Sequence, residues 1–193
     1  MATLHLTRHT SASPAAVWDV VSGFAGYGDW MPMTRMTIDD GAPRVGWGFI
    51  GISGVGPLSF SDSMLVTRWE PAAGATGATR PVAPAVFRIV KTGRLLGGFA
   101  EITVTPEPNV STPGAMGARL DWVEDVVVRP MPFKRFFAPV LDRASRWLYG
   151  RAVDAMLSRA VETSRAVEAS RAVETSPAGS GTDEPTEGAG SSP

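Results

Sequence analysis

The stretch ARLDWVEDVVVRPMPFKRFFAPVLDRASRWL, residues 118–148, changes its hydrophobic period halfway along. Up to Val128 apolar and polar residues largely alternate, which is typical of a strand with one buried face. Beyond Pro130 and Pro132 the apolar residues recur every three or four positions, as they do on one side of a helix. A stripe this long and aromatic needs a partner surface. We therefore predict that the helix packs on a sheet that contains this strand.

The predicted helix runs from Phe133 to Leu157. Its apolar stripe consists of Phe133, Phe136, Phe137, Val140, Leu141, Ala144, Trp147, Leu148 and Met156. Pro139 lies inside this segment, and a proline within a helix removes a backbone hydrogen bond and clashes with the preceding turn. We expect a kink at Pro139 or a helix that starts just before it.

Upstream of residue 118, most of the chain has the pattern of strands separated by turn residues. A first strand covers residues 3–10 (TLHLTRHT), and five more are predicted between Met36 and Pro106. Short links favour antiparallel neighbours, because a parallel crossover needs a dozen or more residues. Together with the strand at 118–128, this gives seven antiparallel strands.

Two short helices are predicted between the first two strands. Ser13 is a candidate N-cap, Pro14 then occupies the first helical position, and Gly23 ends the element. The segment YGDWMPM, residues 27–33, indicates a further helical turn that is broken at Pro32.

The C-terminal part is a repeat, SRAVET, SRAVEA and SRAVET, residues 158–175. A six-residue period drifts around a helix, so the repeated valines cannot form one buried stripe. We predict a domain over 1–157, a solvated helical extension over 158–175 that lies outside the packed body, and a disordered tail over 176–193. The tail contains no aromatic or large aliphatic residue.

Composition and charge exclude several classes of protein. The chain has no cysteine, which excludes disulfides and thiolate chemistry, and both histidines lie in the first ten residues, so no metal site is expected. The formal net charge is −1, and the tail holds three of the acidic residues and no basic one, so a nucleic-acid partner is not expected. No phosphate loop or nucleophile elbow is present, and we expect no cofactor. Without a signal pattern or an apolar run of about 20 residues, we expect a cytoplasmic protein with no integral membrane segment.

Four segments make the chain resemble the SRPBCC superfamily, also called START-like or birch-allergen-like. They are SASPAAVWDVVSGFAGYGDWMP at 11–32, VTRWEP at 66–71, KTGRLLGG at 91–98 and LDWVED at 120–125. Within the superfamily the chain is most similar to the polyketide cyclase/dehydrase-like group, over about residues 4–157.

The resemblance implies an α+β helix-grip fold. In this fold a seven-stranded curved antiparallel sheet wraps around a long C-terminal helix, and two short helices follow the first strand. It also implies an internal cavity for an apolar or aromatic molecule. The superfamily includes ligand carriers, aromatase/cyclases, and regulators of hormone or stress response, so the activity stays open.

Glu124 is the first candidate for chemistry. Strict alternation places it on one face with Leu120, Trp122 and Val126, and three apolar neighbours indicate that this face meets the helix. Burial of a carboxyl group in an apolar pocket favours its protonated form and suits it to general acid or base catalysis. The alternative is a structural role, in which Glu124 pairs with an inward arginine or lies at the cavity mouth.

Arg88 is the natural partner of Glu124 if its side chain points inward. Alternation puts Phe87, Ile89 and Lys91 on one face of that strand and Arg88 on the other, but both faces are apolar enough to leave the orientation open. An outward, surface arginine is equally compatible with the pattern.

Two more acidic residues interrupt apolar strands. Asp62 is either a polar cavity residue or, more commonly for such a position, part of a bulge or an edge. Glu101 alternates with Phe99 and Thr103 and is expected to face solvent.

The expected cavity wall is largely aromatic, although ordinary core packing explains many such residues equally well. The candidate ligand-binding residues are Trp30, Met33, Trp47, Phe49, Phe87, Phe99, Trp122, Phe137 and Leu141. We expect the protein to bind a small hydrophobic, aromatic or lipid-like molecule. One alternative is a polyketide aromatase/cyclase or dehydratase that uses Glu124 and Arg88. Another is a protein-interaction or stress-response module that docks through its C-terminal extension.

Overall fold

The computed structural model describes residues 2–31, 33–72, 83–109, 112–128 and 134–174, and in the last segment it describes the side chains of Trp147 and of residues 149–170. A strand comes first, then helical turns, six further strands and a long helix. In chain order these are β1 (Ala2–Thr10), α1 (Pro14–Ser22), η1 (Phe24–Gly26), α2 (Tyr27–Trp30), β2 (Thr34–Ile38), β3 (Gly48–Ser53), η2 (Gly56–Leu58), β4 (Phe60–Glu70), β5 (Ala85–Lys91), β6 (Leu96–Pro108), β7 (Met116–Val128) and α3 (Lys134–Glu174).

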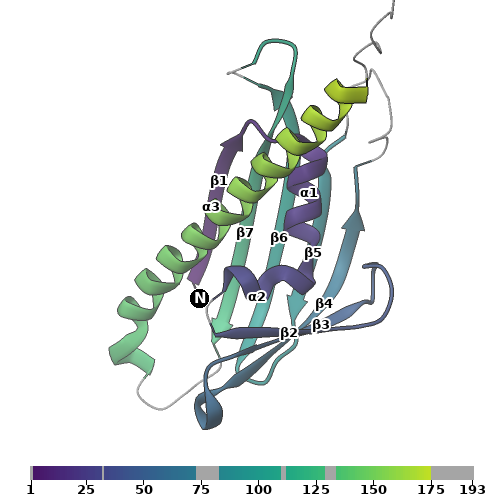
Figure 1. Cartoon of the computed structure of the whole chain (residues 1–193). Helices are drawn as coiled ribbons and strands as arrows, with labels where there is room; N and C mark the ends of the chain where they lie inside the picture. The colour runs from purple at the N-terminus through teal and green to yellow at the C-terminus, as the bar shows by residue number, and fades with distance from the viewer. Residues whose placement is uncertain (1, 32, 73–82, 110–111, 129–133, 175–193) are drawn as a thin grey trace, which may run out of the picture.

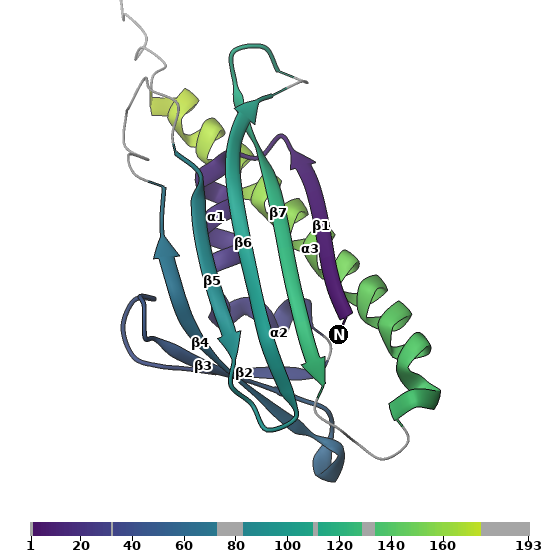
Figure 2. The ribbon, with the colours of Figure 1, turned by 180° about the vertical axis from the view of Figure 1, so that it is seen from behind.

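The strands form one antiparallel sheet in the order β1-β7-β6-β5-β4-β3-β2. The first strand therefore lies beside the last. In Figure 1, α1, α2 and α3 all lie in front of the sheet, and α3 crosses the strands diagonally towards α1. Figure 2 shows the opposite side, where no described helix covers the strands. We call the covered side the inner face and the other side the outer face. The predicted helix-grip fold is confirmed.

The start of α1 forms as its sequence predicts. The Oγ atom of Ser13 accepts a hydrogen bond from the backbone N–H of Ala16 at 3.3 Å, and Pro14 occupies the first turn. Ser13 pairs a backbone N–H that would otherwise lack a partner in the first turn, and Pro14 has no N–H that needs one. Both residues therefore favour a helix that starts here. The buried side of α1 carries Val17, Trp18 and Val21.

The sheet is strongly curved. The register of β4 against β5 shifts between Val66 and Arg68, and such an irregularity bends the strand and increases its twist. In β6, Gly98 has a φ of +108°, and a Cβ atom at this position would collide with the carbonyl oxygen of Asp125. In Figure 1, β2 and β3 consequently run across the direction of β7.

Helix α3 begins at Lys134, so Pro139 lies near its start. Its buried residues recur at helical spacing: Ala152, Val153, Met156, Leu157, Ala160 and Ser164. Phe133 lies outside the described residues, as do the side chains of Phe137 and Leu141. Among the described residues, no helix is long and apolar enough to cross a membrane.

The first repeat copy and Ser164, the first residue of the second copy, pack against the domain, which corrects the prediction that the whole repeat lies outside it. Ala160 is fully buried, and Ser164 is 8% exposed. The Oγ atom of Ser164 accepts a hydrogen bond from the backbone N–H of Ser13 at 2.9 Å. Packing therefore passes the predicted boundary at Leu157 and reaches the start of α1. Residues 165–170 are exposed.

Candidate functional site

One end of the inner face is a packed aromatic cluster, which we call the aromatic end. Phe24 is its centre. Its ring stacks on Phe49 with centroids 4.5 Å apart, meets Phe87 edge-on at 5.2 Å, and lies 5.6 Å from Trp47. The full set is Trp18, Phe24, Trp47, Phe49, Trp69 and Phe87.

This packing bears on three predicted ligand contacts. Trp47, Phe49 and Phe87 do lie on the inner face, and each is at most 2% exposed. However, Phe24 and its neighbours already cover their rings. A ligand would touch these three residues only if Phe24 moved, so in this structure they act as core.

The other end of the inner face carries charge, and we call it the charged end. It consists of Asp62 on β4, Lys91 on β5, Glu124 on β7 and Tyr149 on α3. Lys91 is paired in register with Gly98 of β6, and Glu124 is paired with Ala100 of the same strand. Because these two β6 residues are so small, the lysine side chain can reach across β6 towards Glu124.

The ammonium group of Lys91 joins the two carboxylates. Its Nζ lies 2.7 Å from Oδ2 of Asp62 and 3.3 Å from Oε1 of Glu124. The hydroxyl of Tyr149 donates a hydrogen bond to the same Oε1 at 3.2 Å. All three charged residues are at least nine-tenths buried, since their exposed fractions are 8% for Asp62, 7% for Lys91 and 2% for Glu124.

Three buried polar atoms at the charged end have no hydrogen-bond partner among the described residues. They are Oδ1 of Asp62, Oε2 of Glu124 and the indole Nε1 of Trp122. Trp122 neighbours Glu124 on β7, and its ring meets that of Tyr149 edge-on at 6.2 Å. Buried polar groups are nearly always paired in native proteins, so these three atoms are candidates for contact with a further molecule.

The electrostatics of the charged end follow from burial and from these contacts. Burial alone would lower the pKa of Lys91, but Tyr149, Glu124 and Asp62 together raise it above its ordinary value. The pKa of Tyr149 is raised by burial and then by Glu124. Tyr27 behaves in the same way, because it is buried near Glu124 and Tyr149. The structure thus holds the lysine charged and both phenols neutral.

Glu124 points to the inner face, as alternation along β7 predicts. Its partner is Lys91, and Arg88 points to the outer face. There the Arg88 guanidinium lies 4.0 Å from the centroid of the Phe99 ring and 3.8 Å from a carboxylate oxygen of Glu101. Glu101 is on the outer face too, as predicted. Arg88 and Phe99 are therefore corrected as site residues, since neither side chain reaches the inner face.

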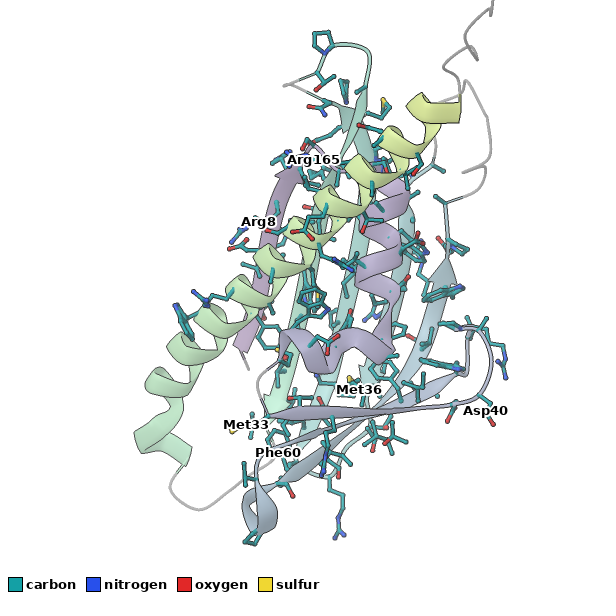
Figure 3. All side chains as sticks on the ribbon, viewed as in Figure 1. Arg8, Met33, Met36, Asp40, Phe60 and Arg165 are labelled. Carbon is teal, nitrogen blue, oxygen red and sulfur yellow. The ribbon has the colours of Figure 1, made fainter. Side chains whose placement is uncertain are left out.

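Two further predictions are also corrected. Met33 is 68% exposed, and Figure 3 places it at the start of β2, at the edge of the sheet. Asp62 is in neither a bulge nor an edge strand, because β4 is an interior strand and its register shift lies at Val66/Arg68. Trp30 is half-buried and packs against the core, and Trp122 is 5% exposed beside the charged end.

Lys91 and Tyr149 are the members of the site that sequence reasoning misses. Lys91 shares a strand face with Phe87 and Ile89, and a lysine on an apolar face was the available signal. For Tyr149 the signal was weaker, because a tyrosine beside a helical stripe is ordinary.

Comparison with known families gives one match that spans most of the chain. The model for the family described as polyketide cyclase / dehydrase and lipid transport matches residues 1–162. This range extends past Leu157, as the packing of α3 does. No curated protein sequence matches the chain significantly.

Several solved structures share the fold. A protein from Thermus thermophilus has a TM-score of 0.56 and 10% identity, and the match covers 84% of this chain and 99% of that one. The Zhui aromatase/cyclase from a Streptomyces species has a TM-score of 0.53 and 16% identity, with 82% and 92% covered. A protein from Chromobacterium violaceum has a TM-score of 0.50 and 14% identity, with 82% and 96% covered.

At these identities the similarity to solved structures shows a common architecture and no more. The family match over residues 1–162 is the more specific finding, and it agrees with the sheet, the helices and their order. The chain belongs to the polyketide cyclase / dehydrase and lipid transport family.

Proposed function

We propose that this protein binds a small hydrophobic molecule, aromatic or lipid-like, between the inner face of the sheet and α3. The observation that carries the proposal is the charged end. Three buried charged side chains lie there together, and two carboxylate oxygens and one indole N–H have no partner among the described residues. The family description, which includes lipid transport, supports the same class of ligand.

We connect these buried charges with function because their burial costs free energy. Transfer of charged groups out of water costs several kcal/mol per ion, and apolar residues of similar size often give an equally stable or more stable core. Unpaired buried oxygens add to this cost. A site that accepts such a cost has another use for its polar atoms, and orientation of a mainly apolar ligand is the use that fits.

Binding can be tested with Nile red, an uncharged lipophilic dye, and with native mass spectrometry of the freshly purified protein. We expect saturable dye fluorescence with one site per chain, and displacement of the dye by small aromatic molecules. If the dye shows no saturable binding and the protein carries no organic ligand, the proposal fails.

A matched pair of variants locates the binding. Lys91→Met changes the inner face, and Arg88→Met makes the same kind of change on the outer face of the same strand. We expect Lys91→Met to change the affinity for polar aromatic competitors and Arg88→Met to leave it unaltered. Equal effects of both variants would place the dye somewhere else.

A second function is favoured by one contact, the hydrogen bond from Tyr149 to Glu124. In an aldol ring closure of a polyketide-like chain, the carboxylate of Glu124 takes a proton from carbon, and a carbon–carbon bond forms as the carbonyl double bond becomes an alkoxide. Tyr149 gives its proton to the alkoxide and regains one from Glu124, so atoms and charge balance. The family description includes cyclases.

The cyclase reading is tested with a soluble poly-β-ketone analogue and product analysis. Glu124→Gln keeps the shape of the side chain and removes the base, so we expect a loss of turnover of at least about a hundredfold. Glu101→Gln on the outer face is the matched control, and its turnover is expected to equal that of the wild type. Undiminished turnover in Glu124→Gln would exclude Glu124 as the base.

A further inference from the structure

At the charged end the hydrogen-bond donors are largely occupied, whereas two acceptor oxygens have no partner among the described residues. The donors are occupied: Lys91 donates to Asp62 and forms an ion pair with Glu124, with its Nζ also 4.0 Å from Sδ of Met64, and Tyr149 donates to Glu124. The hydroxyl of Tyr27 donates to the backbone carbonyl of Val21. The described side chains thus leave few protons to offer a ligand.

The acceptors, in contrast, are only half used. Oδ2 of Asp62 and Oε1 of Glu124 each receive a hydrogen bond, whereas Oδ1 and Oε2 of the same carboxylates receive none. Within the described part of the chain, one donor at this end has no partner, the indole N–H of Trp122. Both free oxygens belong to carboxylates that contact the same ammonium, so the two carboxylates lie together on the inner face.

The net charge of the charged end also disfavours an anionic ligand. One ammonium and two carboxylates carry a formal charge of −1 between them. Since these groups are buried, water screens this charge far less than at the surface. An anionic ligand would meet uncompensated negative charge, and among the described side chains it would find one free donor, at Trp122.

We infer that the charged end selects an uncharged or cationic ligand that donates hydrogen bonds, such as a phenol, an alcohol or an amine on an apolar body, and rejects free carboxylic acids. Oδ1 of Asp62 and Oε2 of Glu124 accept from the ligand, and in a phenol or an alcohol the ligand's oxygen also accepts from the N–H of Trp122. This inference rests on the proposed function and specifies its ligand class. It separates phenolic or alcoholic compounds from fatty acids, which share an equally apolar body.

A ligand series on one ring system tests the inference. The probes are 2-methylnaphthalene, 2-naphthol, 2-naphthylmethylammonium and 2-naphthoate, measured by displacement of Nile red from the wild-type protein at pH 7. We expect 2-naphthol and the ammonium compound to bind about tenfold more tightly than 2-methylnaphthalene, because each donates to a buried carboxylate. We expect 2-naphthoate to bind more weakly than 2-methylnaphthalene.

The possible outcomes separate the inference from the function beneath it. If no probe displaces the dye and the dye itself does not bind, the proposed function fails and the inference with it. If 2-naphthoate binds as tightly as 2-naphthol or more tightly, binding stands and the inference is overturned, since the free oxygens would then carry a proton or face away from the ligand. Equal affinity for all four probes would overturn it as well.

Two variants test whether the carboxylates of Asp62 and Glu124 cause the preference for 2-naphthol over 2-naphthoate. Asp62→Asn and Glu124→Gln each replace one negative charge with an isosteric amide, and we expect each to reduce the advantage of 2-naphthol over 2-naphthoate by about tenfold. Asp121→Asn is the control, because Asp121 lies on β7 but pairs with Thr7 and Arg119 on the outer face. An unchanged preference in both inner-face variants would overturn the assignment, and the wild-type series stands even if one variant does not fold.

Discussion

The two ends of the inner face are built from the same sheet but are filled in opposite ways. At the aromatic end, Phe24 fills the space above Phe49 and Phe87, and the rings cover one another. At the charged end, Lys91 and Glu124 are buried to a similar degree, yet polar atoms beside them have no partner among the described residues. The aromatic end is therefore complete by itself, whereas we propose that a ligand completes the charged end.

The difference shows that burial has opposite effects on the free energy of folding at two positions of one strand. On β5, the inward residues Phe87 and Lys91 are both buried and are separated by Ile89. Burial of Phe87 stabilises the fold directly, because apolar surface leaves water. Burial of Lys91 costs free energy, which its two carboxylate partners offset. We expect changes at the aromatic end to act mainly on stability, and changes at the charged end to act also on binding.

The largest expected effect is at the centre of the aromatic end. Phe24→Ala leaves a cavity between three aromatic rings and should lower the free energy of unfolding by about 4 kcal/mol. Phe24→Leu, which fills more of the space, should cost less than half as much. Urea denaturation followed by tryptophan fluorescence measures both. A loss below about 1 kcal/mol for Phe24→Ala would show that the aromatic end is not a tightly packed core.

The next effect is at the charged end. Lys91→Met leaves Asp62 and Glu124 buried without a counter-charge and should cost about 3 kcal/mol in the free energy of unfolding. The triple variant Lys91→Met/Asp62→Asn/Glu124→Gln removes all three charges and should recover part of this loss. It should also lose the preference for 2-naphthol. If the triple variant were less stable than Lys91→Met alone, the buried charges would be stabilising the fold, contrary to our interpretation.

A smaller effect is expected where α3 covers α1, the helix that contributes Trp18 to the aromatic end. A chain that ends at Leu157 lacks Ala160 and Ser164 and should unfold with about 1–2 kcal/mol less free energy than a chain that ends at Ser170. The chain ending at Ser170 should match the full-length protein. Thermal denaturation measures the stability of the three chains. Equal stability of all three would mean that the domain ends at Leu157, as the sequence predicts.

The smallest effect on stability concerns Tyr149. Tyr149→Phe removes one hydrogen bond to Glu124, which Lys91 still contacts, and should cost about 1 kcal/mol. The ionisation of Tyr149 in alkali can also be followed by tyrosinate absorbance, because Tyr27 and Tyr149 are the only tyrosines of the chain.

Both phenols have a raised pKa in the folded protein, and so does the ammonium of Lys91. A raised folded pKa contributes stability that is complete below the unfolded pKa, about 10 for these groups, and is lost as pH rises beyond it. We therefore expect no tyrosinate absorbance until the protein unfolds in alkali. Tyrosinate that forms near pH 10 while the circular dichroism is still native would mean that these phenols are accessible to solvent.

The sequence predicts the fold more completely than the site, for physical reasons. Alternation identifies the inward face of β7 because only Glu124 interrupts an apolar row, and it fails on β5 because both faces are apolar. The packing of Ala160 and Ser164 escapes a search for large apolar residues, since small residues are what let α3 approach α1 closely. The filling of the aromatic end by Phe24 depends on tertiary contacts that no periodicity encodes.

The tryptophan side chains allow the two ends to be compared in one spectrum. The indole N–H of Trp122, at the charged end, has no partner among the residues that the structure describes, whereas that of Trp47 at the aromatic end donates to the backbone carbonyl of Asp39 at 3.1 Å. Their NMR signals can be assigned with Trp122→Phe and Trp47→Phe in protein labelled with 15N-tryptophan. On titration with 2-naphthol, we predict a saturable shift of the Trp122 signal and little change at Trp47. A shift at Trp47 with Trp122 unmoved would place the ligand at the aromatic end and contradict our assignment of the charged end as the binding site.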